Sequence, residues 1–143
     1  MNYGRLALAA VAATIVDGIY GFLVYGMLLS GEFGRYPSVF RASDAQHLPV
    51  MFAGILVGMF AVSYIFAKGY EGRGQIEGAR FGVLVGILNA GYFVGTDYGI
   101  LNIGRKLAVE MAAAGLIEWT LVGLAIATVY RPAPAPRAVA AGV

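Results

Sequence analysis

The sequence predicts an all-α integral membrane protein in which four transmembrane helices form a bundle. Of its 143 residues, 59% are hydrophobic and only 13% are charged, and the mean hydropathy is +0.75. A soluble domain usually carries about 25% charged residues, so this chain lacks the polar surface that a soluble globule needs. Four apolar runs each approach the roughly 20 residues that cross a bilayer as a helix. A membrane barrel would instead use alternating strands of about ten residues.

The limits of the apolar runs predict the four spans at residues 6–30, 49–67, 81–98 and 107–130. The third span is short if it stops before Asp97, so it would then be thin or extended by irregular backbone. Because all four runs are needed to build one bundle, residues 1–130 are predicted to form a single domain.

The connections differ in length and composition. Residues 31–48 mix aromatic and charged side chains, and Pro37 opposes a continuous helix, so we expect a long loop at the membrane interface. Residues 68–80 are Gly-rich and charged and predict a tight polar turn, and residues 97–106 predict a short connection. Residues 131–143 form a Pro/Ala-rich tail that is expected to be extended.

Lysine and arginine residues in the loops indicate the orientation, because they concentrate on the cytoplasmic side. The side that holds both termini has six, and the opposite side has four: Arg5, Lys68, Arg73, Arg80, Arg131 and Arg137 against Arg35, Arg41, Arg105 and Lys106. This difference favours both termini in the cytoplasm. We therefore expect a multi-pass protein of the inner (cytoplasmic) membrane of a bacterium.

Two acidic residues lie near the middle of predicted spans. Asp17 follows Arg5 by twelve residues, and Glu118 follows Lys106 by twelve residues. If each basic residue marks a membrane face, both acids lie about 18 Å deep at 1.5 Å per residue. Asn89 lies near the middle of the third span. We therefore expect Asp17, Asn89 and Glu118 to form a polar cluster at the membrane midplane.

A carboxylate at this depth costs several kcal/mol unless it is protonated, paired or hydrated. No basic residue is predicted at the same level, so at least one acid should be protonated. Three interpretations stay open: protonated acids that join helices, a proton-binding or cation-binding site, and contact with a partner or cofactor. The expected supporting residues near this level are Thr14, Tyr20, Ser63, Tyr92, Thr120 and Trp119.

Glycines recur at four-residue spacing in the second and third spans. Small residues at this spacing allow helix backbones to approach closely in lipid. The pairs are Gly54 and Gly58, Gly82 and Gly86, and Gly91 and Gly95. They predict either packing within the bundle or an interface with another copy or a partner protein. Tyrosines near the span ends, among them Tyr25, Tyr70 and Tyr130, are typical of an interfacial aromatic belt.

Most catalytic and cofactor classes have little support in the sequence. There is no cysteine, which removes thiolate chemistry and cysteine-ligated metals. The single histidine, His47, precedes the second span; a haem held by two histidines would need another, so a capping or interfacial role is favoured over cofactor ligation. No metal site, no catalytic motif and no nucleic-acid partner is predicted. A bound lipid or pigment stays compatible with the aromatic faces.

The sequence thus predicts a non-catalytic accessory or scaffold subunit of a larger membrane protein complex. It would contact the lipid bilayer and other membrane subunits through Gly-rich helix faces and aromatic side chains. The alternative is a small oligomeric proton-coupled transporter or channel that uses Asp17 and Glu118. A homo-oligomer is compatible with both.

Overall fold

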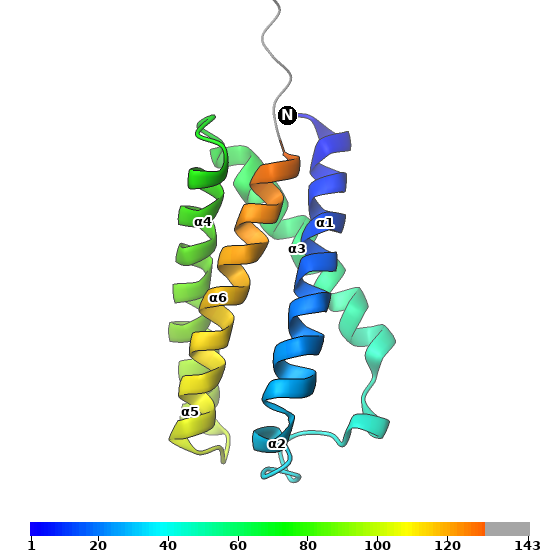
Figure 1. Cartoon of the computed structure of the whole chain (residues 1–143), viewed down its shortest axis with the longest axis vertical. Helices are drawn as coiled ribbons and strands as arrows, with labels where there is room; N and C mark the ends of the chain where they lie inside the picture. Colours follow the sequence, from blue (N-terminus) through cyan, green and yellow to red (C-terminus); the bar gives the residue numbers. More distant parts are fainter. Residues whose placement is uncertain (131–143) are drawn as a thin grey trace, which may run out of the picture.

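The structure is a computed structural model that describes residues 1–130, so the predicted tail at 131–143 lies outside the described residues. Helices contain 82% of the described residues, and none of these residues is in a strand. In Figure 1 the first residue and the end of the last helix lie at the same end of the molecule.

The four long segments are each apolar and long enough to cross a membrane. They are α1 (Tyr3–Gly21) continued by η1 (Phe22–Leu28); α3 (Leu48–Gly69); α4 (Gln75–Leu88) continued by η3 (Asn89–Val94) and α5 (Gly95–Ile100); and α6 (Arg105–Val129). The connection after the first segment contains the short helices α2 (Ser30–Phe33) and η2 (Ser43–Ala45).

The third segment is longer than its apolar run predicts, because it begins at Gln75 and spans 26 residues. The Glu77 carboxylate in the first turn of α4 accepts the backbone N–H groups of Glu71 at 2.6 Å and Arg73 at 2.9 Å. Gly72 and Gly74 turn the chain with φ angles of 88° and 65°, which L-residues with a side chain rarely adopt. These features shorten the predicted polar turn and start the helix early.

Two of the long segments change to π-helical geometry part-way along. The π-helices η1 and η3 contain 7 and 6 residues. The widened turn is visible at the end of η1, where Leu29 N–H donates to the carbonyl five residues earlier, on Val24, at 2.8 Å. π-Helices are rare and usually only one turn long. The irregular extension predicted for the third span therefore has a counterpart in the first span.

Helix α6 lies between α4 and α1 (Figure 1) and packs against both. Its contact with α4 depends on glycines, since Gly78, Gly82 and Gly86 are the buried residues of α4. A Cβ atom built at Gly82 would lie 2.8 Å from the Thr120 Cα, and one built at Gly123 would lie 2.8 Å from the Gly82 Cα. The two backbones therefore approach so closely that no side chain fits between them.

The apolar core is divided between the two ends of the molecule. At the end that holds the N-terminus, side chains of α1, α3 and α6 meet around Phe66, Val122 and Ile126. At the opposite end, Leu107 of α6 packs with the connection after η1, including Phe33 and Phe40. Between these clusters, α1 and α6 face each other with polar side chains.

The buried residues of helix α3 lie in its second half, and in its first half the Phe52 ring lies 3.7 Å from the position that a Cβ on Gly18 of α1 would take. The buried residues of α3 are Met59, Ser63 and Phe66, and its contacts are mainly with α1. In Figure 1 the first half of α3 leaves the bundle and leads to the connection at the lower right. Val50 and Val57 in this first half are 72% and 71% exposed.

Candidate functional site

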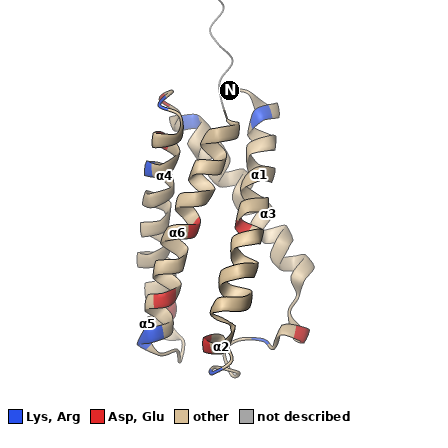
Figure 2. Cartoon of the chain, viewed as in Figure 1, with Lys and Arg blue, Asp and Glu red and all other residues tan. Residues whose placement is uncertain are grey.

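The two mid-span acids lie on facing helices. Figure 2 shows an acidic position on α1 and another on α6 at a similar height, about half-way along the bundle. Asp17 and Glu118 are both half-buried, and they are close enough to repel each other when both are ionised. Neither forms an ion pair with a basic residue in the described part of the chain. The two carboxyl groups therefore share one polar region without a compensating cation.

Tyr25 connects the first segment to this region. Its hydroxyl donates a hydrogen bond of 2.9 Å to the Glu118 Oε2, across 93 residues of sequence. The pattern of tyrosines at span ends assigned Tyr25 to an interfacial belt, and sequence reasoning missed it as a partner of Glu118. The residue lies in η1, where the wider π-helical turn changes the direction in which each side chain points.

Tyr20 and Asn89 approach α6 one turn before Glu118. The Tyr20 hydroxyl donates to the Ala114 carbonyl oxygen at 2.9 Å. The Asn89 amide lies where the side chain of Gly115 would be, and the Tyr25 hydroxyl is 3.9 Å from the same position. Gly115 thus makes room for polar groups from the first and third segments. The structure brings Asp17, Glu118, Tyr20 and Tyr25 together, with Asn89 beside them.

None of the other expected supporting residues forms a hydrogen bond with this cluster within residues 1–130. Thr14 and Thr120 each donate to a carbonyl of their own helix, on Ala10 at 2.8 Å and on Leu116 at 2.7 Å. The Ser63 hydroxyl is buried and has no hydrogen-bond partner within residues 1–130. The Tyr92 side chain is 65% exposed. Trp119 packs beside the core cluster around Val122.

The predicted glycine pairs have different surroundings. Gly82 and Gly86 lie at the crossing with α6, where a Cβ on Gly86 would be 3.0 Å from the Leu116 Cα. Gly54, Gly58 and Gly91 have no atom within 4 Å of the position that a Cβ would take, and for Gly95 the nearest such atom is a carbonyl oxygen of its own segment at 3.7 Å.

His47 is the residue that precedes α3, and its side chain makes no capping hydrogen bond there. It is exposed. No group of three or more His, Cys, Asp or Glu residues in the described range is arranged to hold a metal ion.

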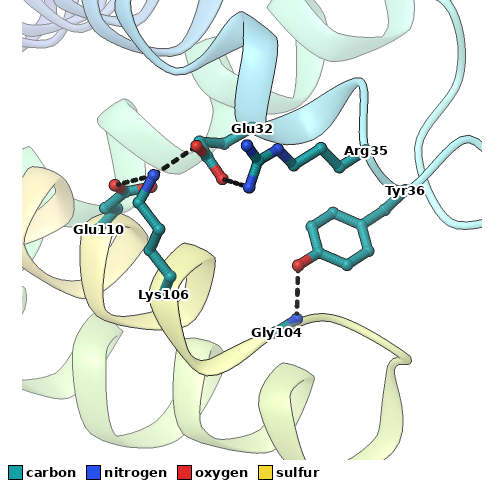
Figure 3. A network of polar contacts seen from close by, with 6 residues as sticks. All are labelled: Glu32, Arg35, Tyr36, Gly104, Lys106 and Glu110. Carbon is teal, nitrogen blue, oxygen red and sulfur yellow. Dashed lines mark hydrogen bonds and ion pairs between the residues drawn. The ribbon is translucent and has the colours of Figure 1, made fainter.

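A second polar network joins the connection after η1 to the start of α6 (Figure 3). Glu32 pairs with Lys106 and, at 3.4 Å, with Arg35, and Lys106 also lies 3.5 Å from Glu110. The Tyr36 hydroxyl accepts a 3.0 Å hydrogen bond from the Gly104 N–H. The Glu32 side chain is only 17% exposed. The hydrogen bond from Lys106, reinforced by Arg35, holds the pKa of Glu32 below its usual range.

The chemistry open to this polar cluster follows from its composition. A protonated carboxyl group can both donate and accept a hydrogen bond, whereas a carboxylate only accepts. Two carboxyl groups without a cationic partner are costly if both are ionised in an apolar medium. The cluster of Asp17, Tyr20, Tyr25 and Glu118 is therefore suited to hold a proton, to accept a small cation, or to join α1 to α6.

Neither the protein-family models, nor the curated proteins, nor the solved structures gave a match to this chain.

Proposed function

We propose that this protein is a non-catalytic accessory or scaffold subunit of a larger membrane protein complex, in the inner membrane of a bacterium and with both termini in the cytoplasm. The observation that carries the proposal is the first half of α3. This half extends away from the bundle and exposes large apolar side chains, including Val50 and Val57. At its glycines, Gly54 and Gly58, no described atom lies within 4 Å of the position that a Cβ would take.

Glycine in the interior of a helix is less favourable than alanine by about 1 kcal/mol. In lipid, that cost is offset where a second helix approaches the glycine face closely. The described chain supplies such a helix for the glycines of α4, whereas no atom of residues 1–130 lies within 4 Å of the Cβ positions of Gly54 and Gly58. A helix of another membrane subunit, packed against Gly54 and Gly58, would complete this contact.

The test replaces Gly54 with leucine and asks what copurifies in mild detergent. Because no atom lies within 4 Å of the added Cβ position, the variant should fold normally by circular dichroism. We expect partner proteins that copurify in fixed ratio with the natural chain to be lost from Gly54→Leu. The matched control is Ala53→Leu, which also introduces a leucine but on a different side of the helix.

Two results would contradict the proposal. One is a monodisperse assembly of this chain alone, with no other protein in fixed ratio. The other is equal loss of partners in Gly54→Leu and Ala53→Leu. Flotation with liposomes, resistant to carbonate extraction, checks membrane insertion independently. A chain that is released by carbonate would overturn the membrane assignment itself.

A second candidate function, a proton-coupled transporter or channel, is favoured by the pairing of Tyr25 with Glu118 beside Asp17. A tyrosine hydroxyl and two carboxyl groups could pass a proton between α1 and α6. The test is proton flux into liposomes that contain the natural chain, Asp17→Asn or Glu118→Gln. Flux should be lost in both variants and kept in Glu110→Gln, an acid about 12 Å away along the same helix. Absence of flux in the natural chain would reject this candidate.

A further inference from the structure

The end of the molecule that holds the N-terminus has a hollow outside the midplane cluster. Its cavity volume is about 770 Å³, within the range of small-molecule sites. Side chains from the start of α1, the end of α3 and the end of α6 meet around it. The lining residues are Met1, Asn2, Tyr3, Ala67, Lys68, Tyr70 and Tyr130.

The hollow carries the positive charge of Lys68. Its ammonium group lies over the Tyr64 ring, 5.5 Å from the ring centroid. Among residues 1–130, no Asp or Glu lines the cavity. The acids closest in sequence, Glu71 and Glu77, are engaged elsewhere: Glu71 pairs with Arg73 at 3.1 Å, and Glu77 accepts the backbone N–H groups of the turn.

Other residues of the lining carry hydrogen-bond donors. The Asn2 Oδ1 already accepts the Arg5 N–H at 3.1 Å, which leaves the amide NH₂ of Asn2 as a donor. Tyr3, Tyr70 and Tyr130 bring hydroxyl groups to the lining. The rings of Tyr70 and Tyr130 are held edge to face, 5.7 Å apart, so these groups belong to a fixed wall. A lysine with several neutral donors suits a phosphate group.

The position of the hollow identifies the source of that phosphate. It lies where three apolar helices end, which is the depth of the lipid head groups if the helices cross the bilayer. Basic pockets between transmembrane helices on the cytoplasmic side bind anionic head groups. Tyrosines with an apolar ring and a polar tip are also characteristic of this depth.

We propose that this hollow binds the phosphate head group of an anionic phospholipid, with Lys68 as the charged contact and the tyrosine hydroxyls and Asn2 as neutral donors. The proposal rests on the membrane insertion that the proposed function assumes. It does not require a partner subunit or proton transfer.

The experiment titrates the full chain, purified in mild detergent, with phosphatidylglycerol or phosphatidylcholine and counts bound lipids by native mass spectrometry. We expect phosphatidylglycerol to bind more tightly, and Lys68→Gln to weaken it roughly fivefold, the effect of about 1 kcal/mol per basic residue near the surface. Tyr130→Phe keeps the ring and should weaken binding about twofold. Arg80→Gln, at the same end of the molecule but outside the lining, should leave it unchanged.

Equal binding of the two lipids, or equal weakening in Lys68→Gln and Arg80→Gln, would overturn the proposal. Displacement of phosphatidylglycerol by millimolar inorganic phosphate would assign the hollow to a free anion and overturn the lipid assignment. These outcomes differ from failure of the membrane assignment, which liposome flotation reports separately.

Discussion

The α4–α6 crossing and the first half of α3 use the same residue at the same spacing with opposite results. Gly78, Gly82 and Gly86 are buried against α6, and a Cβ at any of them would collide with its backbone or side chains. Gly54 and Gly58 are also four residues apart, yet no described atom lies within 4 Å of the position that a Cβ would take at either glycine. One glycine face is filled from within the chain, and the other is open.

The difference lies in the opposing helix. Helix α6 presents glycines of its own, Gly115 and Gly123, at the positions that face the third segment. Small residues on both helices allow two backbones to come this close, so glycines on one helix need small residues on the opposing helix. For Gly54 and Gly58, residues 1–130 supply no such opposing helix, which is why the proposed function places that helix on a partner.

The largest expected effect tests the closed contact. Gly82→Ala would place a Cβ 2.8 Å from the Thr120 Cα, and because backbone atoms cannot rotate away, we expect a loss of about 2 kcal/mol of unfolding free energy. Unfolding by dodecyl sulfate in mixed micelles, followed by circular dichroism, measures this loss. Natural stability in Gly82→Ala would mean that the two helices lie farther apart than described.

The next effect tests how α1 is held to α6. Tyr25→Phe removes the hydroxyl that donates to Glu118 at 2.9 Å. Hydrogen bonds between helices in lipid contribute about 1 kcal/mol, and we expect a loss of that size in the same assay. Tyr92→Phe is the control, since the Tyr92 side chain is 65% exposed; an equal loss in both variants would argue against a specific bond.

The third effect concerns the network at the start of α6 and appears as a dependence on pH. Because the folded state lowers the pKa of Glu32 below the unfolded value of 4.5, its contribution is present above that value and disappears as the pH falls through the lower, folded pKa. Unfolding measured from pH 7 to pH 3 should show Glu32→Gln less stable than the natural chain at pH 7, with the difference closing at the acidic end.

The control for this third effect is Asp44→Asn, at an exposed acid of the same connection. Its unfolding free energy should match that of the natural chain from pH 7 to pH 3. If the difference between Glu32→Gln and the natural chain were constant with pH, the ion pairs of Glu32 would not be its cause.

The smallest effect tests the open face. Gly54→Ala adds a methyl group where no atom lies within 4 Å. Alanine is the better helix former, so we expect the purified chain to be unchanged or more stable by up to about 1 kcal/mol. A loss comparable to that of Gly82→Ala would show that the face is already occupied within the chain or by a second copy.

The helical class and the four segments could be predicted from the sequence, because length and hydropathy suffice to recognise helices that can cross a membrane. The ends of the segments could be predicted less well. Hydropathy places the start of the third span at residue 81, after the polar residues. In the structure α4 begins at Gln75, because the Glu77 carboxylate holds the preceding turn. These hydrogen bonds depend on the backbone of the turn rather than on the apolar run.

The polar cluster could be predicted from the sequence only in part. Counting residues at a constant rise places Asp17 and Glu118 at a similar depth, and this counting is insensitive to small changes of twist. The direction in which Tyr25 points is sensitive to twist, and it depends on the π-helical turns of η1. Likewise, the sequence shows which glycines are suitably spaced but not which helix stands opposite them.

The hydrogen bond between Tyr25 and Glu118 also has a consequence for synthesis of the protein. These residues are 93 positions apart, and ribosomes add about 5 to 20 residues per second. If the chain inserts as proposed, α1 reaches the membrane roughly 5 to 20 s before α6 exists. During this interval Asp17 has no neighbour on α6, so its carboxyl group must be protonated or shielded by the insertion machinery. Helix α6, the last to be made, completes the bundle by contacting both α1 and α4.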